Sequence, residues 1–191
     1  MTNLIAIDPG YSLSGQGCAC ARLVEGELTD AWFARPTAEA WRLAHEHNCG
    51  NPALDVVVWE CPQPREGRGR RGTGAVATPA VLVQLTAAGA TLAGLYAGAW
   101  GAARVIARTP SAWKGTLPKP VQHSDLWDML TEHEQHILGG ERTHNAILKA
   151  REAGALKRWP PGRNFYAASW LTHNLLDAVA LAMTEIGRMS R

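Results

Sequence analysis

Residues 3–10 read Asn-Leu-Ile-Ala-Ile-Asp-Pro-Gly, an apolar run that ends in a carboxylate and a turn. The run predicts a central strand over residues 3–8, and the Pro-Gly pair predicts the turn that ends it. Asp8 is the last residue of this strand. A carboxylate in an apolar element is costly to bury unless something compensates its charge. The stretch therefore predicts the first strand of a sheet and one ligand of a cation site.

Two further stretches place an acid in the same setting. One is Val-Val-Val-Trp-Glu (56–60), which ends a second apolar strand at Glu60, and the other sets Asp177 inside the apolar C-terminal helix. Separated carboxylates of this kind supply the oxygen ligands that a hard divalent cation prefers. Structural roles are the alternatives, since Glu60 could cap the following loop and Asp177 could pair with an arginine. Taken together, the acids favour a metal site.

The order of the predicted elements indicates a single α/β domain over residues 1–191. Asp8 and Glu60 then lie at the carboxyl ends of neighbouring strands, where open α/β sheets carry their sites. Periodicity and turn residues predict strands at 3–8, 15–22, 28–34, 54–59 and 104–108, and helices at 37–47, 80–100, 121–138, 141–155 and 167–189.

The acidic stretches resemble, in order, the motifs of the RuvC-type Holliday junction resolvases, which belong to the ribonuclease-H-like superfamily. The similar segments are Ile-Ala-Ile-Asp-Pro-Gly-Tyr-Ser-Leu-Ser-Gly (5–15), Val-Val-Trp-Glu (57–60), Thr-Pro-Ser-Ala-Trp-Lys-Gly (109–115) and Leu-Leu-Asp-Ala-Val-Ala-Leu-Ala (175–182). The resemblance implies a ribonuclease-H-like mixed five-stranded sheet flanked by helices. Segment 116–165 matches none of these motifs and indicates a divergent, phage-type member.

The resemblance also implies a metal-dependent endonuclease that resolves four-way DNA junctions. Two Mg²⁺ ions per active site, for which Mn²⁺ can substitute, would activate water and stabilise an in-line displacement. The family carries Asp or His three residues before the last acid, where this chain has Asn174, and His173 lies one residue earlier. Both remain candidates. The implied catalytic residues are Asp8, Glu60, His173 and Asp177, and the implied metal ligands are Asp8, Glu60, Asn174 and Asp177.

The distribution of charge fits a polyanionic partner. Residues 1–60 carry three Arg or Lys against eight Asp or Glu, whereas residues 61–191 carry 16 against nine. A Gly- and Arg-rich loop at 61–79 directly follows Glu60, and mobile arginines beside a catalytic acid are well placed to hold phosphates. A basic surface loop without function explains the same composition. The candidate DNA-binding residues are Arg65, Arg68, Arg70, Arg71, Lys114, Lys119, Lys157 and Arg158.

The expected partners are branched DNA and a second copy of the chain, because a four-way junction has approximate two-fold symmetry. The Ala- and Gly-rich helix at 80–100 is the candidate interface, with small residues at Ala90, Gly94 and Gly98. This helix is long enough to span a bilayer, but its apolarity is weak, and we expect no membrane association. The absence of a secretory pattern predicts a cytoplasmic protein, in the bacterial host if it is phage-encoded.

The sequence suggests three alternative functions. Another ribonuclease-H-like nuclease, acting on RNA–DNA hybrids or on branched or flap DNA, would have the same acidic core. A catalytically inactive junction-binding protein is suggested by Asn174 at the fourth position. A sugar-kinase or actin-like ATPase also begins with an Asp-x-Gly turn after a strand, but such folds need a duplicated domain and this chain is too short.

Overall fold

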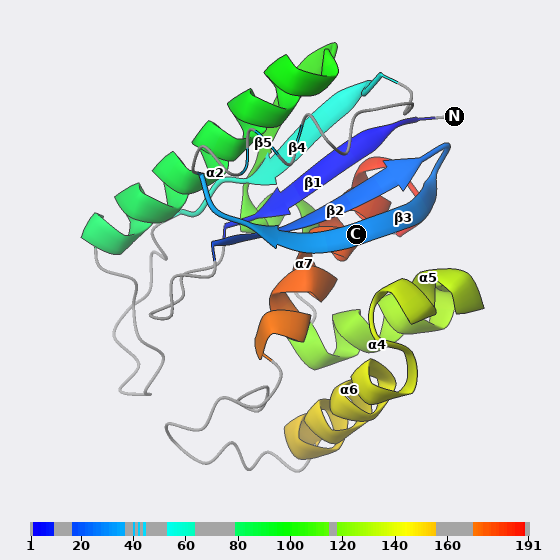
Figure 1. Ribbon diagram of the computed structural model, residues 1–191. Helices are drawn as coiled ribbons and strands as arrows, with labels where there is room; N and C mark the ends of the chain where they lie inside the picture. Colours follow the sequence, from blue (N-terminus) through cyan, green and yellow to red (C-terminus); the bar gives the residue numbers. More distant parts are fainter. Residues whose placement is uncertain are drawn as a thin grey trace.

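The computed structural model describes residues 2–9, 17–36, 40, 42, 44, 53–63, 79–114, 118–155 and 170–189 (Figure 1). The strands are β1 (Leu4–Asp8), β2 (Cys18–Val24), β3 (Glu27–Ala34), β4 (Val56–Glu60) and β5 (Arg104–Arg108). The helices are α2 (Pro79–Trp100), α3 (Pro110–Trp113), α4 (Lys119–Met129), α5 (Glu132–Ile137), α6 (Gly140–Ala155) and α7 (Trp170–Glu185).

The strands form one mixed sheet in the order β3-β2-β1-β4-β5. Strands β1, β2 and β3 pair antiparallel as a meander, whereas β4 runs parallel to β1 and β5 runs parallel to β4. This confirms the predicted α/β class with a five-stranded mixed sheet. It also confirms that β1 and β4 are neighbours whose carboxyl ends lie at the same edge.

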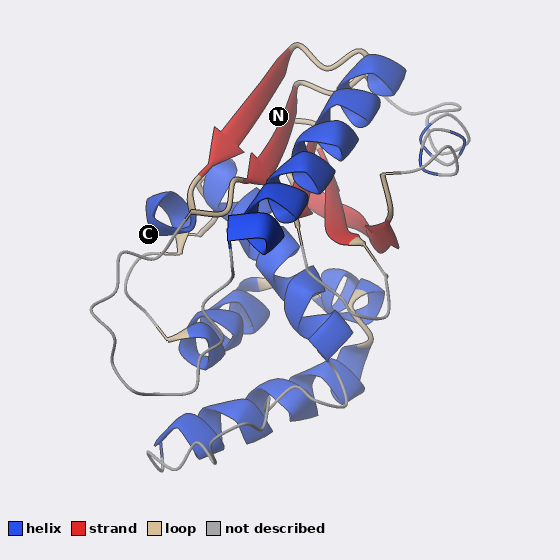
Figure 2. Cartoon of the chain, turned by 90° about the vertical axis from the view of Figure 1, so that its left-hand side faces the viewer, coloured by secondary structure: helices blue, strands red, loops and turns tan. Residues whose placement is uncertain are grey.

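The two faces of the sheet pack into separate cores. Ile5, Ile7 and the odd-numbered residues of β4 pack with α2, whereas Leu4, Ala6 and the even-numbered residues of β4 pack with α4 and α7. Because side chains alternate along a strand, one apolar run thus supplies both cores. Figure 1 shows α2 on one side of the sheet and α7 with α4–α6 toward the other, and in Figure 2 helix α2 crosses in front of the strands.

Several predicted boundaries differ from the structure. The predicted helix at 121–138 is two helices, because Leu130 has extended backbone and Thr131 begins α5 with a capping box that includes Glu134. The short helix α3 was not predicted. Of the predicted helix 37–47 the structure describes residues 40, 42 and 44, all helical, and residues 167–169 of the last predicted helix lie outside the described residues.

Helix α2 is long and apolar enough, by length and composition, to cross a membrane. One of its faces nevertheless belongs to the core, where Leu92, Tyr96 and Trp100 are buried. Gly89 lies on this face, and a Cβ there would approach Pro9 and Trp59 to 2.8 Å. Close packing of α2 on the sheet therefore requires glycine at this position. The opposite face, which includes Ala90, Gly94 and Gly98, is exposed.

Candidate active site

The three predicted acids converge at one edge of the sheet. The parallel register places Ile7 beside Trp59, so that the next residues, Asp8 and Glu60, end their strands side by side. Alternation turns both toward the face covered by α7, which carries Asp177. All three are buried, with exposed fractions of 5% for Asp8, 8% for Glu60 and 1% for Asp177.

A short connection after β5 brings two polar groups to Glu60. Pro110 cannot continue a strand but suits the first turn of a helix, so α3 begins there and ends at Trp113. The indole Nε1 of Trp113 donates to Glu60 Oε2 at 2.9 Å, and Lys114 Nζ lies 2.8 Å from the same oxygen. Lys114 Nζ is also 3.5 Å from Asp177 Oδ2. Lys114, predicted to bind DNA, therefore contacts two of the acids.

Lys119, the second lysine predicted to bind DNA, also reaches the acids. Its Nζ donates to Asp177 Oδ2 at 2.6 Å and lies 2.5 Å from His173 Nε2. His173 is one helical turn before Asp177 on α7, and its Nε2 is 3.2 Å from Asp177 Oδ2. Of the two candidates for the fourth position, His173 thus contacts Asp177, and Asn174 is half-buried on the same helix.

His123 and Trp113 are site residues that the sequence reasoning missed. His123 lies on α4 and is fully buried, and its Nε2 is 3.0 Å from Asp177 Oδ1. A signal was available, because His123 follows Lys119 by four residues, and residues so spaced share one face of a helix. For Trp113 the signal was its place directly before Lys114 in the segment that resembles the family motif.

The electrostatics of the site leave Asp8 short of positive charge. Burial, together with the nearby charges of Glu60 and Asp177, raises the pKa of Asp8 to about 8. Burial opposes ionisation of Asp177 as well, but the charge of Lys119 and the hydrogen bond with His123 hold the pKa of that carboxyl well below its usual range. Lys114 and Lys119 also favour the charged form of Asp8, but burial and the two neighbouring acids outweigh them.

The donors fit a hard divalent cation, although their arrangement does not yet enclose one. Carboxylate oxygens are the preferred ligands of Mg²⁺, and a cation beside Asp8 would offset the burial and the acidic neighbours that raise the pKa of this carboxyl. Within the described part of the chain, no three His, Cys, Asp or Glu side chains already have the spacing of a metal site. Instead the Lys114 ammonium contacts both Glu60 and Asp177. An entering cation would have to displace it.

The remaining predicted contacts with DNA lie outside the described residues. These are Arg65, Arg68, Arg70, Arg71, Lys157 and Arg158. The described residues 61–63 continue directly from Glu60 at the edge of the sheet.

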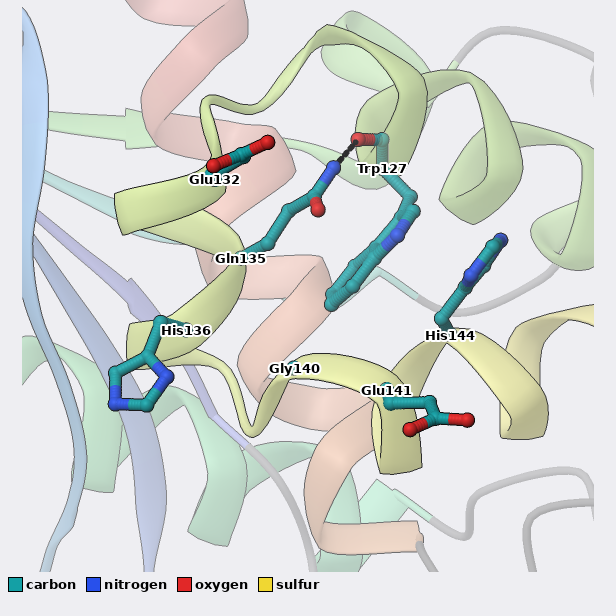
Figure 3. Close-up of a pocket in the computed structure, with 7 residues that line it drawn as sticks. All are labelled: Trp127, Glu132, Gln135, His136, Gly140, Glu141 and His144. Carbon is teal, nitrogen blue, oxygen red and sulfur yellow. Dashed lines mark hydrogen bonds between the residues drawn. The ribbon is translucent and has the colours of Figure 1, made fainter.

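A separate hollow of about 300 Å³ lies between the end of α4, α5 and the start of α6 (Figure 3). Trp127 stacks on His144 there, with ring centroids 5.7 Å apart. The hollow shares no residue with the acidic site, and its charged lining consists of Glu132 and Glu141. Two carboxylates repel phosphate groups, so this hollow does not suit a nucleic-acid backbone.

Comparisons of the chain with protein-family models, with curated proteins and with solved structures returned no match.

Proposed function

We propose that this protein is a metal-dependent endonuclease that resolves four-way DNA junctions, with a ribonuclease-H-like fold of the RuvC type. The observation that carries the proposal is the convergence of Asp8, Glu60 and Asp177, from three distant segments, at one buried edge of the sheet. Carboxylates are rarely buried together unless they share a cation or a proton. The five-stranded mixed sheet is compatible with this fold.

The chemistry would use residues already in place. Asp8 ends the rigid central strand and would hold a cation together with Glu60 and Asp177. Bound Mg²⁺ or Mn²⁺, two per site in the proposed mechanism, would supply an activated water and neutralise charge on the phosphate. Lys114 and Lys119 would then turn from the acids toward the phosphate, to which an ammonium binds as a point charge. The Lys119 side chain is 39% exposed and has room for this movement.

His173 has the better geometry for the fourth position. The ammonium of Lys119 can only donate, so His173 Nε2, 2.5 Å away, accepts that hydrogen bond through its lone pair. Burial also lowers the pKa of His173, which favours the neutral ring. A neutral imidazole nitrogen is suited to ligate a metal or to accept a proton. We therefore favour His173 over Asn174 in this role.

The decisive experiment is incubation of the purified protein with a labelled synthetic four-way junction in Mg²⁺, Mn²⁺ or EDTA. A linear duplex and an RNA–DNA hybrid of the same sequence are the matched controls. We expect symmetric cuts near the branch point that require metal. Cutting of the hybrid instead would retain the proposed fold and metal site but replace the substrate.

A junction-binding protein without cleavage is the second candidate. The observation that favours it is that Lys114 and Lys119 already pair with the acids, as they would in a centre that needs no metal. Such a protein would bind the junction equally in Mg²⁺ and EDTA and leave it uncut.

The arginine-rich loop is proposed to hold the DNA backbone. Replacing Arg68, Arg70 and Arg71 with Ala should weaken junction binding and flatten its dependence on salt. The slope of log K against log salt concentration is negative, and each lost phosphate contact makes it shallower by about 0.9. Binding should therefore be measured by fluorescence anisotropy across a salt series. An unchanged slope would exclude the loop from the DNA contact.

We further propose that the protein acts as a two-fold symmetric dimer, which would place one active site at each of two opposed strands. The exposed face of α2 is the candidate interface. Gly94 and Gly98 lie on it, and a Cβ at either position meets nothing within 4 Å, so the fold of the monomer does not require glycine there. Sedimentation analysis of the full chain would establish its oligomeric state.

A further inference from the structure

His123 is the most deeply buried polar group in contact with the acidic site. Its side chain is fully buried on α4, and its Nε2 lies 3.0 Å from Asp177 Oδ1. An ionised carboxylate can only accept hydrogen bonds, so the Nε2–H of His123 donates. The carboxylate is itself 1% exposed, and this bond joins two groups that solvent does not reach.

The two oxygens of Asp177 have different kinds of partner. Oδ2 faces Lys119, His173 and Lys114, whose side chains are 39%, 17% and 17% exposed. Long lysine side chains at the rim can withdraw and be replaced by a cation or a substrate phosphate. Oδ1 instead faces an imidazole that is fully buried and has no such freedom.

The surrounding helix holds this imidazole in place. The buried residues of α4 include Gln122, Ser124, Leu126 and Trp127, so His123 lies within a packed segment. Rotation of the His123 ring away from Asp177 would therefore disturb close packing.

We propose that His123 is a positioning residue that holds Oδ1 of Asp177 and thereby directs Oδ2 toward the divalent cation. The inference rests on the proposed metal-dependent function. It gives α4 a role in the acidic site, beside the elements that carry the three carboxylates. Outer-shell hydrogen bonds of this kind orient a ligating carboxylate, and their loss costs roughly 10–100-fold in metal affinity. His123 acts through Asp177 and does not itself contact metal or substrate.

The test is Mn²⁺ affinity, measured by calorimetry on the full chain without DNA. His123→Leu should weaken Mn²⁺ binding roughly 10–100-fold. His123→Gln should restore it to near the wild-type value, because the Gln Nε2 is as many bonds from the backbone as the imidazole Nε2. His123→Asn keeps a polar side chain but is one bond too short, and it should bind Mn²⁺ as weakly as the Leu variant.

Ser124→Ala is the matched control. It removes a partly buried hydrogen bond from the same helix, that between Arg151 and Ser124, and should leave Mn²⁺ affinity unchanged. Wild-type affinity in both the Leu and Asn variants, the same loss in Ser124→Ala, or no rescue by Gln would each overturn the inference. So would a wild-type chain that binds no Mn²⁺.

Junction cleavage by the same preparations separates this inference from the proposed function. A wild-type chain that binds Mn²⁺ with the expected variant pattern, but cuts no junction, contradicts the function and supports the role of His123. A chain that cuts junctions, with Mn²⁺ affinity indifferent to His123, contradicts only the positioning role.

Discussion

Two buried carboxylate sites in this molecule have opposite electrostatics. Glu134 on α5 is 1% exposed, and burial would raise its pKa, but hydrogen bonds from Arg188, Leu28 N–H and Thr131 N–H lower it to about 2. Asp8 is 5% exposed, and burial with its acidic neighbours raises its pKa to about 8. Burial alone therefore does not distinguish a functional acid from a structural one.

The difference lies in what the chain itself provides. Both oxygens of Glu134 are hydrogen-bonded, Oε1 to Leu28 N–H and Arg188 Nη1 at 2.9 and 2.7 Å, and Oε2 to Thr131 N–H and Arg188 Nη2 at 2.8 and 3.0 Å. This set, the Glu134 clamp, ties α5 to β3 and to the C-terminal turn. Among the residues that the structure describes, the acidic site has no equivalent set of hydrogen bonds to Asp8. We infer that the clamp serves stability and that the acidic site serves a ligand.

The largest effect that separates the two sites is expected from Asp8→Asn. Loss of a direct ligand should reduce metal-dependent junction cleavage by well over the roughly 100-fold that an outer-shell partner costs. Junction binding should persist, because the phosphate contacts come from basic residues. Cleavage and binding should be measured on the same preparation, with and without Mg²⁺.

Thermal stability provides the control for Asp8→Asn. The substitution removes a buried charge that Lys114 and Lys119 offset only in part, so the variant should melt above the wild type at pH 8 in EDTA. A variant that loses binding and melts at a lower temperature would show that Asp8 is a structural residue, which would remove the contrast with Glu134.

The next effect is the loss of stability in Glu134→Gln. The amide nitrogen would face the donors of Arg188, and breaking a buried pair of this kind costs about 3 kcal/mol. For a chain of this size the melting temperature should fall by roughly 6–12 °C. Metal-dependent cleavage per folded molecule should be unchanged, and differential scanning calorimetry with a cleavage assay below the transition measures both.

Glu132→Gln is the matched control for the clamp. Glu132 occupies the same first turn of α5 but is exposed. Its replacement should change the stability by less than about 0.5 kcal/mol. Equal destabilisation by the two substitutions would attribute the effect to the helix terminus rather than to the clamp.

How much of this contrast could be predicted depends on whether the signal is local. Asp8, Glu60 and Asp177 stand out because each is a charged residue in an apolar segment. The alternation of residues in β1 and β4 also determines that Asp8 and Glu60 lie on the same face of the sheet. The capping box that contains Glu134 is also a local pattern, Thr-x-x-Glu, although it was not predicted. These residues were accessible to sequence reasoning.

Contacts between distant segments were not accessible in the same way. His123 lies in a helix of mixed polarity, Lys-Pro-Val-Gln-His-Ser-Asp-Leu-Trp-Asp-Met, where no apolar stripe shows which side is buried. Packing of α4 against α6 and α7 decides its burial. Likewise, nothing near Arg188 in the sequence indicates Glu134 as its partner. The pairing of helices across the fold, rather than local propensity, sets these contacts.

The two sites should also differ in the pH dependence of stability. The folded pKa of Asp8, about 8, is above its ordinary value of 3.8, so its contribution is complete below about pH 4 and is lost as the pH rises through 8. Glu134 has the opposite sign, because its folded pKa of about 2 is below 4.5, and its contribution is lost only as the pH falls toward 2.

Burial lowers the pKa of His173, so this residue changes the stability with pH in the opposite sense to Asp8. Both proteins contain His173, so the difference between Asp8→Asn and the wild type isolates the contribution of Asp8. The melting temperature of the variant relative to the wild type, in EDTA, should be lowest near pH 4 and should rise steadily toward pH 8. Mg²⁺ should reduce this advantage at pH 8, since a bound cation would compensate Asp8 in the wild type. A constant difference from pH 4 to 8 would mean that Asp8 is as well compensated as Glu134, and the acidic site would then have no need of a metal.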